Sequence, residues 1–333
     1  MNATFQKVKK INGELTFKGD KSISHRAVIF ASMAEGISEI FNISECEDVK
    51  STINAFKLLG AEFYYEQEKL LVKGIGKNNF RQPDKIIDCG NSGTTARLLS
   101  GILAAQNFQS TISGDKSLSQ RPMKRIIEPL EMMGAKISHN NFRLPVTFHS
   151  TVNLFPISYE LKIPSAQVKS AILLAGLFND DRTEVIETIP SRDHTERILK
   201  LDYEIRDNKK LIFSSSKNYP TKDQYLIPGD ISSSSFFIVL TLLTKDSQLL
   251  IQNVSINPTR ISFIDILRKM GAEISIEERG ISNGEPSGNI TVKSSELSNI
   301  EISPDLIPNI VDEIPILSVA GIFANGEFHI RNC

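Results

Sequence analysis

Cysteine is scarce in this 333-residue sequence, and its thiols follow no pairing or metal-binding pattern. The three cysteines stand at Cys46, Cys89 and Cys333, so none forms a C-x-x-C pair and their number is odd. A disulfide framework or a structural zinc site is therefore not expected. This usage of cysteine fits a protein that is kept in a reducing compartment.

Long apolar runs and an excess of charge of one sign are also absent. No apolar stretch approaches the roughly 20 residues of a membrane-spanning helix, and the opening MNATFQKVKKINGELTF lacks the apolar core of a signal peptide. The 38 basic and 39 acidic residues nearly cancel, so the average field favours neither nucleic acid nor a membrane. We expect a cytoplasmic protein without nucleic-acid or membrane partners, whose 40% apolar residues can bury a substantial core.

One recurring element is a helix end followed by a strand. It appears as FKLLGAEF (56–63), LEMMGAKI (130–137), LKLDYEI (199–205) and LRKMGAEI (267–274). Gly60, Gly134 and Gly271 suit the left-handed position just past a helix end, and Asp202 takes that place in the third copy. The intervals of 74, 68 and 69 residues predict a repeated unit of about 70 residues.

A second recurring element is a polar turn that precedes an apolar helix and a strand. Five copies begin at residues 19, 89, 163, 227 and 309, and four alternate with the first element. The pattern predicts a mixed α/β protein, of the α+β type, built of repeated βαβαββ units. The fifth copy contains its first helix and strand only, so we expect a chain that stops within a unit.

The polar turns are candidate anion sites. A helix start offers unpaired backbone N–H groups and a partial positive charge. Cations, hydroxyls and small residues gather at three of these starts: Lys21, Ser22, His25 and Arg26; Asn91, Ser92, Gly93, Thr94 and Arg97; Ser165, Gln167 and Lys169. Ordinary helix capping remains an alternative for the hydroxyl residues. If the units pack symmetrically, the three starts form one basic pocket for small polyanions.

Further polar stretches leave a choice between a site and a cap. In GDKSLSQRPMKRIIEPL, Pro122 is expected at the first helical position, with Arg121 beside the helix start as a second anion contact or as part of a basic surface turn. In PSRDHTERIL, Asp193 or Thr195 can cap the helix that follows. In LIPNIVDEIP, Asp312 is either a cap or a general base.

Taken together, these stretches resemble the 5-enolpyruvylshikimate-3-phosphate synthase family (3-phosphoshikimate 1-carboxyvinyltransferases). The resemblance rests on GDKSISHRA, CGNSGTTARLL, GDKSLSQRPMKRIIEPLEMMGA, PSAQVKSAILLAGL, SRDHTER, PGDISSSSFF and DLIPNIVDEIPILSVAGIFANG, which follow the family's order across nearly the whole chain. It implies the two-domain enolpyruvyl-transferase fold, an inside-out α/β barrel. Residues 13–227 would form a complete domain of three units, and residues 1–12 with 228–333 an incomplete second domain.

The resemblance also implies the reaction. Enolpyruvyl passes from phosphoenolpyruvate to the 5-hydroxyl of shikimate 3-phosphate and phosphate leaves, by addition and elimination through a tetrahedral intermediate. No metal or organic cofactor is used. The partners would be these two small molecules, and the full-length form would be a monomer.

Site residues follow from the same motifs. The implied shikimate 3-phosphate contacts are Lys21, Ser22, Arg26, Ser165, Ala166, Gln167, Ser191, Arg192 and Asp312. The implied phosphoenolpyruvate contacts are Lys21, Asn91, Gly93, Arg121 and Gln167. Asp312 would be the base for the 5-hydroxyl and Lys21 the second catalytic group, whereas Glu313 would be structural. Four further residues either contact a substrate directly or support the residues that do: Arg97, Lys124, Lys169 and His194.

The chain departs from the family in one respect and leaves two alternatives open. The family's Lys-Glu-[ST]-Asp-Arg segment is due shortly after Cys333, so we expect the 333-residue chain alone to be inactive or nearly so, and poorly soluble. A transferase acting on UDP-N-acetylglucosamine is disfavoured because the first turn reads Gly19-Asp20-Lys21-Ser22 and residues 114–121 contain no cysteine. A non-catalytic protein that binds shikimate phosphate remains possible. The small residue Gly93 predicts that glyphosate inhibits the full-length enzyme.

Overall fold

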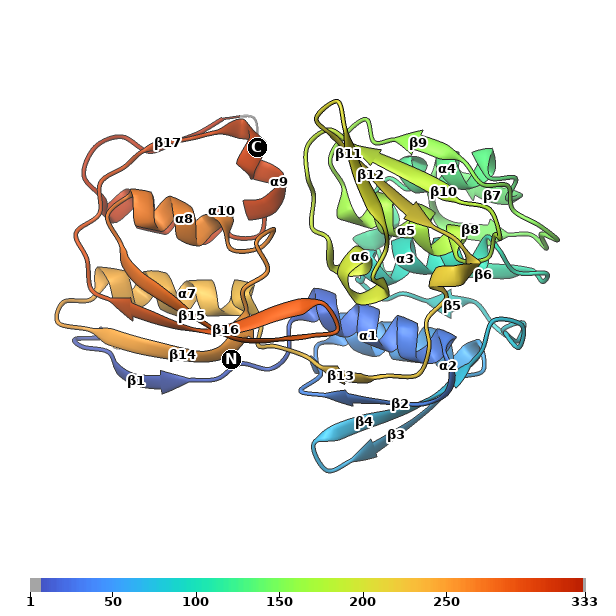
Figure 1. Ribbon diagram of the computed structural model, residues 1–333, viewed down its shortest axis with the longest axis horizontal. Helices are drawn as coiled ribbons and strands as arrows, with labels where there is room; N and C mark the ends of the chain where they lie inside the picture. Colours follow the sequence, from blue (N-terminus) through green and yellow to red (C-terminus); the bar gives the residue numbers. More distant parts are fainter. Residues whose placement is uncertain (1–6, 332–333) are drawn as a thin grey trace. The chain divides into compact units, whose positions relative to one another are not determined.

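The computed structural model describes residues 7–331, and the chain divides into two compact units (Figure 1). Unit 1 comprises Met1–Asp20 and Pro228–Cys333, and unit 2 comprises Lys21–Ile227. Each unit has a hydrophobic core of its own. Cys333, which was considered above, lies outside the described residues.

The N-terminal boundary of unit 2 lies later than residue 13. Strand β1 (Asn12–Leu15) pairs in parallel with β14 (Gln248–Ser255). The amide of Ile11 also donates to Ser247 Oγ over 2.9 Å. These contacts join residues 11–15 to a segment more than 200 positions away, so they belong to unit 1.

Unit 2 contains six α-helices and twelve strands among the described residues. The helices are α1 (Lys21–Met33), α2 (Glu47–Leu58), α3 (Gly93–Leu103), α4 (Lys124–Met132), α5 (Ala166–Gly176) and α6 (His194–Leu199), with short 3-10 helices η1 (Leu118–Gln120) and η2 (Ser216–Asn218). The strands are β2 (Glu35–Phe41), β3 (Glu62–Glu66), β4 (Lys69–Ile75), β5 (Ile87–Asp88), β6 (Ser110–Ser113), β7 (Ile137–Asn140), β8 (Arg143–Phe148), β9 (Ser158–Glu160), β10 (Thr183–Glu187), β11 (Tyr203–Arg206), β12 (Lys209–Ser214) and β13 (Gln224–Leu226).

The strands of unit 2 form three sheets of the same design. Their orders are β13-β2-β4-β3, β5-β6-β8-β7 and β9-β10-β12-β11. In each sheet the first pair is parallel and the next two pairs are antiparallel. In two of the sheets a helix lies in sequence between the two parallel strands. In the remaining sheet the strand parallel to β2 is β13, the last strand of the unit. The predicted βαβαββ repeat is confirmed.

Unit 1 repeats this design. Its helices are α7 (Ile231–Leu243), α8 (Ser262–Lys269), α9 (Ile307–Ile310) and α10 (Ile314–Phe323), with the 3-10 helix η3 (Pro304–Leu306), and its other strands are β15 (Glu273–Ser282), β16 (Glu285–Lys293), β17 (Glu301–Ile302) and β18 (His329–Ile330). The sheet β1-β14-β16-β15 has one parallel and two antiparallel pairs, and β17 and β18 form a separate parallel pair.

Within unit 2 the apolar helices lie inside and the sheets lie outside. Helices α1, α3 and α5 are buried over most of their lengths and pack on one another, and each also packs against its own sheet. Beyond their polar N-terminal halves these helices are mostly apolar and bury consecutive residues, which is typical of helices enclosed in a protein core. The sheets remain open, so the described strands form no closed barrel, whereas the expectation was an inside-out barrel.

The helix ends confirm three predicted positions and correct the fourth. Gly60, Gly134 and Gly271 have φ values of 111°, 94° and 106°. In the third copy the left-handed residue is Lys200, at φ 51°, and not Asp202. The hydrogen bonds explain the shift: Leu201 N donates to Glu196 O just as the residue after each glycine donates five positions back.

One stretch of unit 1 is apolar enough to be tested against the dimensions of a membrane. In the part of the chain that the structure describes, no single helix has both the length and the hydropathy of a membrane span. The pair Pro304–Ile310 and Ile314–Phe323 passes that test jointly, on length and composition alone, and is bent by 117°.

A charged cluster lies inside unit 2 and joins α5, β10 and α6. Lys169 is fully buried, with Nζ 2.7 Å from Glu187 Oε2 and 2.6 Å from Glu196 Oε1. Burial alone would lower the pKa of Lys169, but Glu196 and Glu187 together raise it. The cluster therefore keeps its lysine charged, and it holds three elements of the third repeat together.

Helices α3 and α5 approach so closely that their contact requires a glycine. A Cβ atom at Gly101 would lie 2.1 Å from the carbonyl oxygen of Ala171. Gly101→Ala should therefore destabilise unit 2 by about 1–3 kcal/mol, which corresponds to a fall of roughly 2–4 °C in Tm for each kcal/mol. Thermal unfolding followed by circular dichroism measures it. Gly280→Ala is the control, because no described atom lies within 4 Å of its Cβ position; equal Tm values for both variants would contradict the proposed packing.

Removing the buried lysine should be far more costly than removing an exposed one. Lys169→Met leaves Glu187 and Glu196 buried without their cation, for which we expect a loss of about 3–5 kcal/mol in the free energy of unfolding. Lys73→Met removes an exposed ion pair with Glu62, at 2.9 Å, and should cost less than about 1 kcal/mol. Urea unfolding of both variants measures the difference. Similar losses would show that the buried cluster contributes no more than a surface pair.

Candidate active site

The first turns of α3 and α5 are joined by an arginine and a glutamine. Arg97 Nη1 donates to Gln167 Oε1 over 2.5 Å, and Gln167 Nε2 donates to Thr94 Oγ1 over 3.0 Å. Thr94 and Gln167 are each the second residue of their helix. The two helix starts therefore lie side by side, with N–H groups that intrahelical bonds leave unpaired.

The second turn of α1 reaches α5 and α6 through Arg26. Its guanidinium donates from Nη2 to Ser170 Oγ over 3.0 Å and from Nε to Thr195 Oγ1 over 2.7 Å. A third bond, from Nη1 to the carbonyl oxygen of Ser22, spans 3.0 Å. Because Arg26 is almost completely buried, it fastens α1 to its neighbours in the core.

A chain of buried hydroxyl groups links α1, α2 and α3. His25 Nδ1 lies 2.7 Å from Thr52 Oγ1, which lies 2.7 Å from Thr95 Oγ1. Thr95 in turn donates to Ser92 Oγ over 2.7 Å, and that oxygen caps α3 by accepting from the Thr95 amide. His25 and Ser92 are thus buried polar groups of the scaffold that joins these three helices.

Two guanidinium groups flank Gly93 at the start of α3. A Cβ atom there would lie 2.7 Å from Arg97 Nη1 and 3.5 Å from Arg121 Nη1. Burial, followed by the charges of Arg121 and Arg125, lowers the pKa of Arg97. Like charges at this spacing repel each other, so an anion bound between them would be stabilised.

Arg121 is oriented by a short polar relay. Its Nη2 donates to Asn91 Oδ1 over 3.0 Å, and Asn91 Nδ2 donates to Asp115 Oδ2 over 2.6 Å. The bond from Asn91 and one from the Leu118 amide lower the pKa of Asp115. Pro122 was expected at the first helical position, and this is wrong. The chain is extended at Arg121, after η1, and α4 begins only at Lys124.

Several predicted contacts lie at the helix starts themselves. Lys21 is the exposed first residue of α1, with Nζ 3.2 Å from Asp48 Oδ2. Ser165 caps α5 by accepting from the Val168 amide over 3.4 Å, and Ala166 is the half-buried first residue of that helix. The small side chains at 165 and 166 keep the backbone amides of this start close to the surface.

The supporting cations divide into different environments. Lys169 is enclosed by the buried glutamates and so does not present its charge to a ligand, contrary to its grouping with the cations of the third turn. Lys124 is exposed and pairs with Glu128 over 3.5 Å. Arg192 is half-buried in the turn before α6, and His194 is the buried first residue of that helix.

The thiol in the CGNSGTT motif has no chemical role at this site. Cys89 is fully buried at the end of β5, and burial raises the pKa of its thiol to about 12. A thiol with such a pKa is almost entirely protonated at neutral pH and is a poor nucleophile. Among the described residues, no group of three or more His, Cys, Asp or Glu side chains could hold a metal ion.

Asp312 belongs to unit 1, beside a buried arginine that sequence reasoning missed. Arg260 Nη1 lies 3.7 Å from Asp312 Oδ2, and its Nη2 lies 3.5 Å from Glu313 Oε1. Ser232, at the start of α7, donates to Glu313 Oε1 over 2.5 Å. Asp312 is half exposed, whereas Glu313 is fully buried. Asp312 is therefore accessible to solvent, whereas Glu313 bonds Ser232 and Arg260 inside the unit.

The electrostatics of Arg260 reflect this acidic setting. Burial would lower its pKa, but Asp20, Glu313, Asp312 and Asp230 outweigh burial and raise it. Its only local signal is an arginine in the turn NPTRIS before an amphipathic helix, a pattern that occurs at many helix starts. Its partners are distant in sequence, so the cluster could not be read from that turn.

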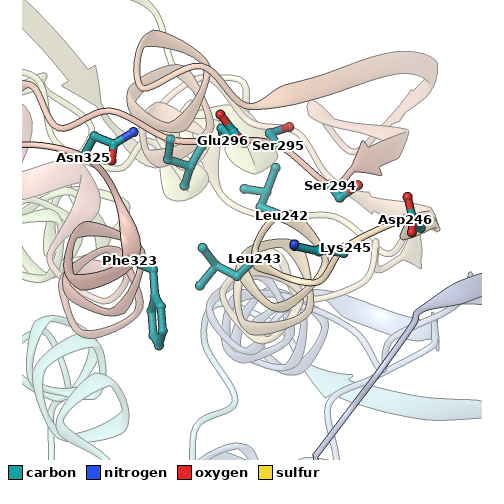
Figure 2. Close-up of a pocket in the computed structure, with 10 residues that line it drawn as sticks. Leu242, Leu243, Lys245, Asp246, Ser294, Ser295, Glu296, Phe323 and Asn325 are labelled. Carbon is teal, nitrogen blue, oxygen red and sulfur yellow. The ribbon is translucent and has the colours of Figure 1, made fainter.

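A cavity of about 670 Å³ in unit 1 lies away from these groups (Figure 2). Its lining includes Leu242 and Leu243 from the C-terminal end of α7 and Phe323 from the end of α10, with Lys245 and Glu296 at its polar part. Ser232 and Asp312 stand at the opposite, N-terminal ends of the same helices. The cavity is therefore no part of the candidate site.

Two curated relatives of this chain are 3-phosphoshikimate 1-carboxyvinyltransferases. A 3-phosphoshikimate 1-carboxyvinyltransferase of Petrotoga mobilis is 47% identical over 328 residues, which are 97% of this chain and 76% of the relative. The enzyme of that name from Salinibacter ruber is 42% identical over 336 residues, which are 100% of this chain and 78% of the relative.

Solved structures show the same relationship. The EPSP synthase of Acinetobacter baumannii superposes with a TM-score of 0.85 at 39% identity, covering 96% of this chain and 73% of that one. The enolpyruvyl transferase NikO of Streptomyces tendae shares the fold at 16% identity, with a TM-score of 0.73 over 96% of this chain and 74% of that one. Residues 5–333 match the family described as EPSP synthase (3-phosphoshikimate 1-carboxyvinyltransferase), and the chain belongs to this family.

Proposed function

We propose that this chain carries the activity for which its relatives are named, the transfer of enolpyruvyl from phosphoenolpyruvate to the 5-hydroxyl of shikimate 3-phosphate. The observation that carries the proposal is the pair of guanidinium groups, Arg97 and Arg121, around Gly93, beside Gln167 at the adjoining helix start. Two polyanionic substrates repel each other, and a site that binds both must supply concentrated positive charge.

The shikimate 3-phosphate contacts are proposed at the starts of α1 and α5 and in the turn before α6. They are Lys21, Ser22, Arg26, Ser165, Ala166, Gln167, Ser191 and Arg192. The small residues at the α5 start support this, because a phosphate can approach the backbone amides there. At Ala166 the contact would come from the backbone. Asp312, which precedes α10 in unit 1, is proposed as a further contact.

Phosphoenolpyruvate is proposed to bind at the start of α3. Its contacts are Lys21, Asn91, Gly93, Arg121 and Gln167. Asn91 holds Arg121 by a hydrogen bond of 3.0 Å, which favours a fixed, charge-assisted contact with a carboxylate or phosphate. Arg97, which sequence reasoning could not rank, is added here because it bonds Gln167 and borders Gly93.

Asp312 is proposed as the base of the addition step and Lys21 as the cation that offsets the charge of both substrates. As Asp312 accepts the proton of the 5-hydroxyl, that oxygen bonds to C2 of phosphoenolpyruvate and the methylene carbon gains a proton. Loss of a proton from the new methyl group then expels phosphate and restores the double bond. The half-exposed Asp312 carboxylate, 3.7 Å from Arg260, is accessible for this role.

Two helices of unit 1 differ from those of unit 2 in their exposed apolar faces. Large apolar side chains of α7 and α10 are exposed: Phe236, Phe237, Leu240, Val319, Ile322 and Phe323. In unit 2 the corresponding faces of α1, α3 and α5 pack on one another. The chain spans 76–78% of the length of the two relatives compared above.

Location and assembly are proposed from the chain's own chemistry. Cys46 and Cys89 are free thiols, which supports a reducing, cytoplasmic location. The near-neutral net charge of −1 supports small-molecule partners in place of nucleic acid or a membrane. A monomeric full-length enzyme remains a proposal, which light scattering would test.

Calorimetry and a turnover assay test the proposed function. The 333-residue chain should bind shikimate 3-phosphate, and Gln167→Ala should weaken binding by about tenfold, the effect of one lost hydrogen bond of about 1.4 kcal/mol. Gln224→Ala is the matched control, since Gln224 is exposed and bonds Glu39. Absence of binding to the wild-type chain would refute the proposal.

Turnover separates the remaining possibilities. Enolpyruvyl transfer to shikimate 3-phosphate supports the enzyme, whereas transfer to UDP-N-acetylglucosamine would favour the alternative transferase. Binding of shikimate 3-phosphate without turnover would contradict the proposed activity and favour the non-catalytic alternative.

Gly93→Ala should weaken binding of phosphoenolpyruvate and of glyphosate while leaving the fold intact. The added Cβ would meet the end of the flexible Arg97 side chain at 2.7 Å, so that guanidinium must move. We expect a loss of at least about tenfold in affinity, measured by calorimetry in the presence of shikimate 3-phosphate, for a displaced contact to a charged group. Unchanged affinity for both anions would argue against a site at Gly93.

A further inference from the structure

The turn at 190–193 carries Ser191 and Arg192 and has no regular secondary structure. It links β10 to α6, so the ladder of β10 does not fix its position. A contact residue in such a turn needs other bonds to hold it in one geometry.

Three polar groups of Ser191 are bound by two buried side chains. The amide of Ser191 donates to Glu187 Oε1 over 3.3 Å, and its hydroxyl donates to the same oxygen. Lys169 Nζ donates to the carbonyl oxygen of Ser191 over 3.4 Å. Glu187 thus binds the amide and the hydroxyl of Ser191, and Lys169 binds its carbonyl oxygen.

Glu187 is itself immobilised. Its second oxygen lies 2.7 Å from Lys169 Nζ, and that nitrogen lies 2.6 Å from Glu196 on α6. Side chains of Lys169 and Glu187 are at most 1% exposed. A rotation of Glu187 away from the turn would leave a buried charge without its partner, which is strongly unfavourable.

The cluster connects the turn to the helix that carries Gln167. Lys169 follows Gln167 by two positions on α5, which corresponds to about 200° around the helix axis. Gln167 accordingly faces Arg97 on α3, while Lys169 faces Glu187 on β10. Ser170 of the same helix also bonds Thr195 of α6 over 2.7 Å. The first residues of α5 therefore contact Arg97 through Gln167, and Glu187 and Thr195 through Lys169 and Ser170.

We propose that Glu187 is a positioning residue, which through Ser191 holds the 190–193 turn in the geometry that binds the phosphorylated substrate. The inference rests on the proposed function, in which Ser191 and Arg192 contact shikimate 3-phosphate. Glu187 touches no substrate in this account. It acts by keeping the turn in place before the substrate arrives, so that binding does not have to order it.

A double-mutant cycle tests this inference. Glu187→Gln and Ser191→Ala should each weaken shikimate 3-phosphate binding by about tenfold in calorimetry. If Glu187 acts through Ser191, the double variant should bind no more weakly than Glu187→Gln alone, because the coupled effects do not add. Full additivity, or wild-type affinity in folded Glu187→Gln, would overturn the inference.

Amide hydrogen exchange supplies a readout that does not depend on the ligand. Glu187→Gln should raise exchange at residues 191–193. Glu39→Gln is the matched control: it removes a partly buried ion pair with Lys69, at 2.6 Å, elsewhere in unit 2, and should change neither exchange in the turn nor affinity. If Glu187→Gln fails to fold, Glu187→Asp retains the charge with a shorter reach and should show the same exchange increase.

The two readouts separate the inference from the function on which it rests. A wild-type chain that does not bind shikimate 3-phosphate refutes the proposed function. Unchanged exchange at 191–193 in the folded Glu187 variants refutes the positioning role, whether or not the ligand binds.

Discussion

The interaction on which the rest of unit 2 depends is the joining of helix starts from different repeats. Arg97 and Gln167 bond α3 to α5, and Arg26 bonds α1 to α5 and α6. Each helix start alone has a weak affinity for anions that solvent and salt screen. When several starts are held together in one unit, their unpaired amides and neighbouring cations act on the same small volume, and the field there becomes specific and strong.

The buried charges of unit 2 serve two different purposes, and their partners distinguish them. Lys169 lies between two glutamates, so its charge is neutralised internally and contributes to the fold. Arg97 instead has other arginines as neighbours, and its burial, followed by their charges, lowers its pKa. Internal neutralisation indicates structure, whereas an excess of like charge at the surface of a core indicates a place for a ligand of opposite sign.

Much of the fold could be predicted because its signals are local. Helix starts, the glycines at 60, 134 and 271, and the repeat length all follow from short patterns that each unit carries. One error arose where this local signal is missing. Asp202 was chosen over Lys200 because the third copy has no glycine to mark the helix end.

The candidate site shows the same division between local and distant signals. The cations at the helix starts stand in recognisable motifs, but burial of Lys169 depends on glutamates 18 and 27 positions away. Arg260 was missed because its partners, Asp20 and Asp312, lie far from it in sequence. The boundary near residue 13 was misplaced for the same reason, since the pairing of β1 with β14 is visible only in three dimensions.

The central claim is that joined helix starts in unit 2 form an anion site. A crystal structure of the chain grown with shikimate 3-phosphate tests it most directly. The account predicts ligand density at the starts of α1 and α5, with phosphate or hydroxyl oxygens within hydrogen-bond distance of Lys21, Ser165 and Gln167. Density for the ligand elsewhere on the chain, with these three side chains unengaged, would contradict it.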